Sequence, residues 1–236
     1  MLKASRVALV VGVLALSVPA FGSAIFQLGD SGWSVSGPSY AEVNVMVDDV
    51  HWSEDWDHSY VLLQIHKKFR AAPDEQGNFS PVTLTFIQTA PDAETVPNIR
   101  IADEAITNLT GVAWTDFHWI LSKFVYASFN SDVPVYTGDP GDTPPGVWDI
   151  YPFKGSSWQS SQTTDQLNVF DGVIPDLGVW YPGIRSSGAL EINVDLDGAP
   201  RNFSFDLKEL PTIPEPATLT LLAAGAAVLI RRRRSR

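Results

Sequence analysis

The sequence predicts an all-β protein: an antiparallel β-sandwich of jelly-roll type, preceded by a signal peptide and followed by a transmembrane helix. Short runs in which apolar and polar residues alternate are typical of strands with one buried face. The 17 glycines and 17 prolines fall mostly between these runs, where they indicate turns. No amphipathic helix longer than three turns is indicated in the body of the chain. Short strands separated by turns favour a sandwich.

The alternation defines the expected strands. It is seen in five runs, which are 43–47, 61–65, 82–86, 190–196 and 203–207. Because Asp197-Gly198-Ala199-Pro200 separates the last two runs, we expect them to pair as a hairpin. The more continuous apolar stretch Trp114–Phe129 is expected to form a buried strand pair. Residues 98–106 fit either a strand or a short helix.

Length and charge limit the class of protein. The 236 residues fit one domain, expected at 25–211, with a tail at each end. Cysteine is absent, which excludes disulfides and any cysteine-based metal or redox site. Residues 25–213 hold 26 of the 27 acidic residues but only nine of the 16 basic ones. Because such a charge repels phosphate, we expect no nucleic-acid partner.

Residues 1–24 have the three parts of a secretory signal peptide. Lys3 and Arg6 give a positive start, and an apolar run follows from Val7 to Val18. Pro19 ends that run, and small residues lead to Ala24. This order predicts export with cleavage after Ala24. Cleavage after Ala20 and an uncleaved anchor are the alternatives.

The C-terminus has the pattern of a short membrane segment. Pro214-Glu215-Pro216 predicts a stiff, extended spacer, because proline disfavours helix in its own and the preceding position. The uncharged segment 217–230 would form a helix about 21 Å long, shorter than a hydrocarbon core of about 30 Å. The basic tail 231–236 follows, and the arginines that would stop transfer are Arg231, Arg232, Arg233 and Arg234. Long guanidinium side chains reach the headgroups, so the body is expected outside and the arginines inside.

In this order, these C-terminal elements resemble a PEP-CTERM sorting signal, a segment also known as an ice-binding protein C-terminal domain. The resemblance covers about residues 212–236, with Pro214, Glu215 and Pro216 as the sorting motif. It implies an exosortase as partner, transit through the inner membrane, and delivery to the cell envelope, outer surface or extracellular matrix. It also implies a link to exopolysaccharide or biofilm. An ordinary single-pass tail is the alternative.

Residues 131–188 are the least regular part of the body and are rich in proline and aromatic residues. Aromatic rings in loops can stack on sugars. The candidate ligand-binding residues here are Trp148, Tyr151, Trp158, Trp180 and Tyr181. Asp195 and Asp197 lie in a tight turn and are candidate ligands for a structural calcium ion, because calcium prefers several oxygen donors. Elsewhere, His51, His58 and His66 lie in a span with several acidic residues, but their spacing matches no metal motif.

Nothing in the sequence indicates catalysis. Gly155-Ser156-Ser157-Trp158 lacks the spacing of a nucleophile elbow, and no carboxylate pair stands out among the many acids. We therefore expect a structural or adhesive envelope protein that is not an enzyme and has no cofactor, calcium excepted. The alternatives are a carbohydrate-binding module with structural calcium and, less favoured, an envelope glycoside hydrolase.

Overall fold

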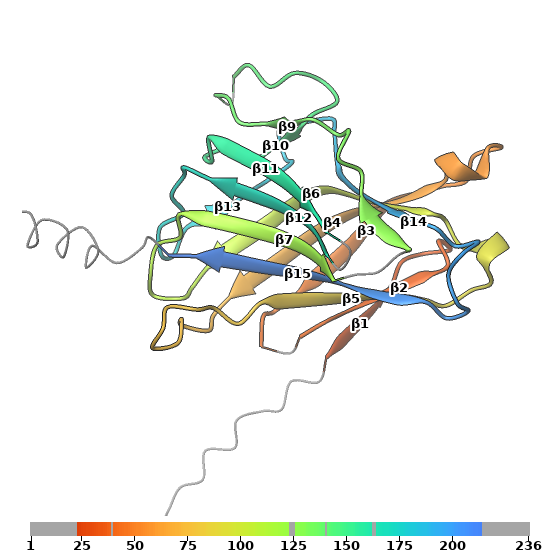
Figure 1. Cartoon of the computed structure of the whole chain (residues 1–236), viewed down its shortest axis with the longest axis horizontal. Coiled ribbons are helices and arrows are strands. Elements are labelled where there is room, and N and C mark those ends of the chain that lie inside the picture. Colours follow the sequence, from red (N-terminus) through yellow and green to blue (C-terminus); the bar gives the residue numbers. More distant parts are fainter. Residues whose placement is uncertain (1–22, 39, 123–125, 140, 162–163, 214–236) are drawn as a thin grey trace, which may run out of the picture.

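The computed structural model describes residues 23–38, 40–122, 126–139, 141–161 and 164–213, which fold into two facing β-sheets (Figure 1). The predicted transmembrane helix at 217–230 and nearly all of the predicted signal peptide lie outside these residues. Ala24, the last residue of that predicted peptide, begins β1 and pairs with Gly37. Among the described residues, no helix has the length and apolar character needed to cross a membrane.

The first sheet has seven strands and is antiparallel throughout. In spatial order they are β1 (Ala24–Gln27), β2 (Trp33–Gly37), β5 (Val82–Gln88), β15 (Ser204–Thr212), β7 (Asp116–Ser122), β12 (Thr164–Phe170) and β11 (Gly155–Ser160). The last strand of the described chain, β15, therefore lies in the middle of this sheet.

The second sheet has six strands. They are β3 (Asn44–His51), β4 (Tyr60–Phe69), β6 (Asn98–Asn108), β14 (Leu190–Val194) and β8 (Ala127–Phe129), with β13 (Val179–Trp180) paired to β6. Two short strands, β9 (Val135–Tyr136) and β10 (Trp148–Asp149), form a small separate sheet. The helical elements in the described part are two 3₁₀ turns, η1 (Trp56–His58) and η2 (Asp92–Glu94).

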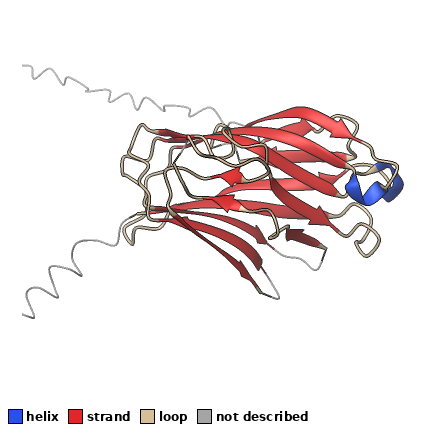
Figure 2. Ribbon diagram, turned by 90° about the horizontal axis from the view of Figure 1, so that it is seen from above, coloured by secondary structure: helices blue, strands red, loops and turns tan. Residues whose placement is uncertain are grey.

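The core lies between the two sheets, which form separate layers in Figure 2. Along β5 and β4 every second side chain is buried, as the alternating pattern predicts. Aromatic rings join the layers: Phe69 of β4 lies 5.8 Å from Phe117 of β7, ring centre to ring centre. The buried apolar residues of both layers form one cluster. Because the described elements are strands apart from two 3₁₀ turns, the all-β prediction is confirmed.

Two predicted pairings are wrong. The runs at 190–196 and 203–207 do not form a hairpin, because β14 pairs with β6 and β8, whereas β15 pairs with β5 and β7 in the other sheet. The stretch Trp114–Phe129 likewise divides into β7 and β8, which belong to opposite sheets. Strands on both sides of a sandwich bury one face in the same core, so alternation identifies strands without assigning them to a sheet. Residues 98–106 are part of strand β6.

The second sheet is not antiparallel at its centre, which differs from the predicted antiparallel, jelly-roll-like arrangement. There β4 and β6 run parallel over ten residue pairs, from Tyr60 beside Asn98 to Phe69 beside Asn108. A parallel pair needs a crossover connection. Here β5 is that crossover: the chain leaves β4, runs through the first sheet and returns as β6.

A bulge in β6 changes which of its side chains face the core. Leu63 of β4 pairs with Ile101, but the next residue, Gln64, pairs with Asp103, so Ala102 is extra. Before the bulge Ile99 and Ile101 are buried; after it the buried residues include Glu104 and Ile106. A bulge re-aims the side chains that follow it, and here it turns the Glu104 carboxyl into the protein interior.

Candidate functional site

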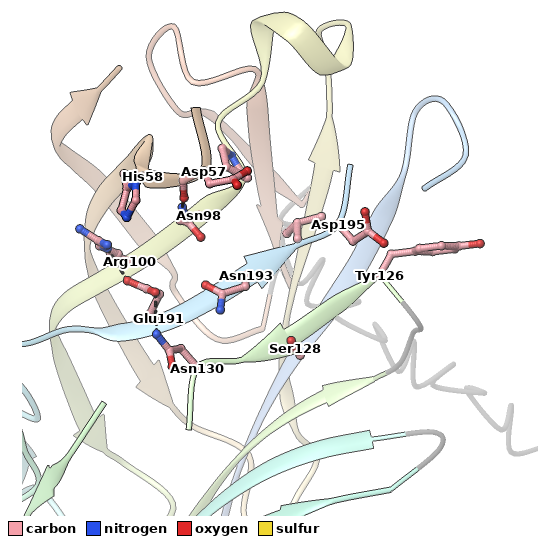
Figure 3. A pocket seen from close by; sticks show the side chains of 12 residues that line it. Asp57, His58, Asn98, Arg100, Tyr126, Ser128, Asn130, Glu191, Asn193 and Asp195 are labelled. Carbon is pink, nitrogen blue, oxygen red and sulfur yellow. Dashed lines mark hydrogen bonds and ion pairs between the residues drawn. The ribbon is translucent and has the colours of Figure 1, made fainter. Parts of the chain in front are cut away.

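An open polar groove of about 650 Å³ on the outer face of the second sheet is the candidate site (Figure 3). Its floor comes from β6, β14 and β8, and η1 borders it. Twelve residues line it: Asp57, His58, Pro97, Asn98, Arg100, Tyr126, Ser128, Asn130, Glu191, Asn193, Val194 and Asp195. Most of these are amides, hydroxyls or charged groups.

The antiparallel register arranges the floor in two cross-strand rows. In the first row, Asn193 of β14 lies between Asn98 of β6 and Ser128 of β8. In the second row, Glu191 pairs with Arg100. Outward side chains on neighbouring strands lie close together when they pair directly. The two rows are two residues apart along each strand and therefore face the same side.

The second row is held by a network of hydrogen bonds and a ring contact. Arg100 Nε donates to Glu191 Oε2 at 2.5 Å, and Asn130 Nδ2 donates to Glu191 Oε1 at 2.8 Å. The Arg100 guanidinium lies 4.2 Å from the centre of the Tyr60 ring, a cation–π contact. Tyr60 in turn stacks on His51, with ring centres 5.1 Å apart. These contacts fix the direction of the Arg100 and Glu191 side chains.

The first row contains one buried polar atom that has no partner within the described ranges. Asn98 Nδ2 donates to the carbonyl oxygens of Asp57 and Ser59, which holds η1 against the sheet. Asn193 Oδ1 has no hydrogen-bond partner among the described residues. A buried or half-buried polar atom without a partner is unfavourable.

The groove suits a neutral or cationic ligand rich in hydroxyl groups. Amide and hydroxyl side chains both donate and accept hydrogen bonds, and the carboxylates of Asp57 and Asp195 add acceptors at the margins. Both oxygens of Glu191 already accept hydrogen bonds from side chains. Glu191 therefore holds the Arg100 and Asn130 side chains in place on the floor.

The five aromatic residues predicted to bind ligand do not form one exposed surface. Trp148 and Trp180 are buried in the core: Trp148 packs on Trp119 at 4.9 Å, and the Trp180 indole nitrogen donates to the carbonyl of Tyr151. A ligand-facing role for these two is therefore wrong. Their rings anchor the irregular segment 131–188 to the sandwich, because large apolar rings gain most from burial.

The other three differ in exposure. Trp158 of β11 is half-buried against Phe129, with ring centres 5.6 Å apart. Tyr151 and Tyr181 are exposed. Tyr181 lines a second depression, of about 940 Å³, with Val179, Ile184 and polar residues of β4 and β6. Tyr151 lies beneath the Arg185 guanidinium, 5.4 Å from its ring centre to the cation.

The described residues do not bring together a set of ligands for the predicted calcium ion. Among those residues, no group of three or more His, Asp or Glu side chains is placed to hold a metal ion. Asp195 borders the groove, and its Oδ1 accepts a hydrogen bond from the Gly198 backbone nitrogen, as in an ordinary turn. Asp197 is exposed. His58 pairs with Asp55 at 2.9 Å on the surface.

Sequence reasoning missed the residues of the groove floor. In the sequence, Glu191 and Asn193 are polar positions of the alternating run 190–196, and Asn98 and Arg100 lie in the segment 98–106, which fits either a strand or a short helix. The available signal was a strand with amides and charges at every second position. The sequence does not show which strands lie beside this one, because those strands are far away in the chain.

Comparison with known families identifies the end of the chain. Residues 212–234 match the PEP-CTERM protein-sorting motif, as the resemblance implied. Neither a curated protein nor a solved structure matches the chain. The motif implies export through an exosortase-type sorting system, with membrane transit to the cell envelope. It begins at Thr212, the residue at which β15 ends.

Proposed function

We propose that the chain is a structural or adhesive protein of the exopolysaccharide matrix, and that it is not an enzyme. The observation that supports this most directly is the PEP-CTERM motif, which starts where the last strand of the sandwich ends. An exosortase-type enzyme would recognise the segment after β15, and the sandwich domain would lie outside the inner membrane. The acidic, cysteine-free body suits a soluble matrix protein stabilised by core packing.

Deletion of residues 214–236 tests the sorting step. The deletion leaves every described strand intact, including β15. We expect the shortened protein to lose its envelope association and to accumulate in soluble periplasmic or culture fractions. Fractionation followed by immunoblotting measures this.

A matched variant, Glu215→Ala, changes the sorting motif and keeps the rest of the tail. We expect this variant also to move from the envelope fraction to the soluble fractions. An unchanged distribution of the deletion variant between fractions would contradict the sorting role.

A second candidate function is glycan binding in the groove on the second sheet. The two polar rows favour it, because their amide and hydroxyl groups can donate hydrogen bonds to sugar hydroxyls and accept hydrogen bonds from them. The groove is open and lacks a wall of aromatic rings, so modest affinity with repeated contacts along a polymer is the expected mode. Structural calcium at Asp195 and Asp197 belongs to this alternative. An envelope glycoside hydrolase is a separate and less favoured alternative.

Replacement of Asn193 by alanine tests the groove. We expect about tenfold weaker binding to exopolysaccharide extracted from the producing cells, the effect of losing about 1.4 kcal/mol in hydrogen bonds. Microscale thermophoresis with and without added calcium measures the affinity and the contribution of the ion.

The matched control is Gln159→Ala, an exposed amide on β11 at the edge of the first sheet. It should bind like the unchanged protein. Equal affinity of the Asn193→Ala variant and the unchanged protein would rule out this groove as the glycan site.

A further inference from the structure

Three ionisable side chains meet in the interior, away from the groove. Lys67 of β4 and Glu104 of β6 come from the second sheet, and Glu209 of β15 comes from the first. Lys67 is 1% exposed, and both glutamates are 0% exposed. Buried charges are costly even when they are paired, and an ion pair buried between two layers adds little to stability compared with apolar packing. A contribution to stability alone therefore does not account for this cluster, and we consider a chemical role for it.

The amine of Lys67 contacts both carboxyl groups. Lys67 Nζ lies 2.5 Å from Glu104 Oε1 and also contacts Glu209 Oε2. The Trp119 indole nitrogen donates to the other Glu104 oxygen at 3.0 Å. Glu209 Oε1 has no hydrogen-bond partner in the described part of the chain. An amine and a carboxyl group are thus held together by strands of opposite sheets, which supplies the proximity that an intramolecular reaction needs.

The two carboxyl groups differ in environment. Burial, together with the negative charge of Glu104, raises the pKa of Glu209 to about 8. At neutral pH the Glu209 carboxyl is therefore protonated, and its carbonyl carbon is more open to nucleophilic attack than that of a carboxylate. Glu104 accepts hydrogen bonds from both Lys67 and Trp119, which suits it to receive a proton from the amine.

We propose that Lys67 and Glu209 join in an intramolecular amide bond, with Glu104 as the catalytic base. Glu104 takes one proton from the Lys67 ammonium group, and the neutral Nζ attacks Cδ of Glu209. The C–N bond forms as the bond from Cδ to the hydroxyl oxygen breaks. A second proton from the nitrogen passes to the departing hydroxyl, which leaves as water. The products are a secondary amide, one water molecule and a protonated Glu104.

The burial of the cluster favours this outcome. Because the reacting groups lie in the core, bulk water has little access for the reverse hydrolysis. The reaction needs no oxidant and no cofactor, since it only transfers protons and releases water. It also removes two charges from the interior, and so relieves the cost of keeping them there.

The bond would join the two sheets covalently. It would connect β4 to β15, and Glu209 lies three residues before Thr212, where the sorting motif begins. A pulling force on the C-terminal segment would then reach the second sheet through a covalent bond in addition to the backbone hydrogen bonds. In a chain with no cysteine, this amide takes the place that a disulfide has in other exported proteins.

Peptide mapping by mass spectrometry of the denatured full-length protein tests the bond. We expect one branched species that contains both residue 67 and residue 209, lighter than its two peptides together by one water. Recovery of the two peptides separately, at their full masses, from folded unchanged protein would overturn the proposal. The exposed pair Lys68–Glu42, 2.7 Å apart, is an internal control and should remain unlinked in the same digest.

The variant Glu104→Gln tests the catalytic role. It preserves the shape of the side chain but removes the base, so the two peptides should appear separately at full mass. Circular dichroism would verify that this variant is folded. A folded Glu104→Gln protein that still forms the branched species completely would contradict the role of Glu104. If the variant does not fold, the map of the unchanged protein still decides whether the bond exists.

Discussion

Replacing Lys67 with alanine is expected to lower the free energy of unfolding by at least about 3 kcal/mol. The change removes the Lys67 ammonium group, which contacts both Glu104 and Glu209, and leaves two carboxyl groups in the core. Breaking a buried ion network by removing one partner typically costs about 3–5 kcal/mol, because the remaining charge is uncompensated. Without Lys67 the proposed amide cannot form either, so a loss is expected whether the unchanged protein holds the ion pairs or the amide. Urea denaturation followed by tryptophan fluorescence measures the loss.

The neighbouring residue provides the control. Lys68 also forms an ion pair, with Glu42 at 2.7 Å, but both side chains are about half exposed, at 46% and 48%. Lys68→Ala is therefore expected to change the unfolding free energy by less than about 1 kcal/mol. Similar losses for the two variants would show that the interior cluster does not stabilise the sandwich in the way its burial implies.

Replacing Gly183 with alanine is expected to cost about 3 kcal/mol or more. Gly183 has a φ of +87°, and an added Cβ would lie 2.1 Å from the Ala102 carbonyl oxygen and 2.6 Å from the Trp148 indole nitrogen. The left-handed conformation costs roughly 1–2 kcal/mol for a residue with a Cβ. The clash with backbone adds roughly 1–3 kcal/mol, since the Ala102 carbonyl belongs to a central strand and has little room to move.

Gly146 separates these two contributions. Its φ is +77°, but no atom lies within 4 Å of the position where a Cβ would be built. Gly146→Ala should therefore show only the conformational cost, about 1 kcal/mol. Thermal unfolding of both variants by calorimetry measures the difference. If Gly183→Ala were no worse than Gly146→Ala, the segment around Gly183 would not be packed as closely on β6 as the structure indicates.

The buried cluster of Lys67, Glu104 and Glu209 shows which buried residues the alternating pattern can predict and which it cannot. Lys67 follows Val61, Leu63 and Ile65 at a spacing of two, and Glu209 follows Phe205 and Leu207 in the same way. Extending the alternation would have placed both charged residues on buried faces. Glu104 could not be found in this way, because the bulge at Ala102 reverses the faces of β6. Bulges depend on pairing with a neighbouring strand and leave little trace in the sequence.

The sequence by itself determined the all-β class, the sorting signal at 212–234 and the faces of several strands. These properties depend on residues close together in the chain: alternation within a strand, turn residues between strands, and the order of elements in a linear motif. Only the tertiary structure decided which sheet each strand joins, that β4 and β6 run parallel, and that Asn98, Asn193 and Ser128 form one row. It also decided that Trp148 and Trp180 belong to the core. The physical reason is that both sheets bury equivalent faces in a shared interior, so local patterns do not distinguish one layer from the other.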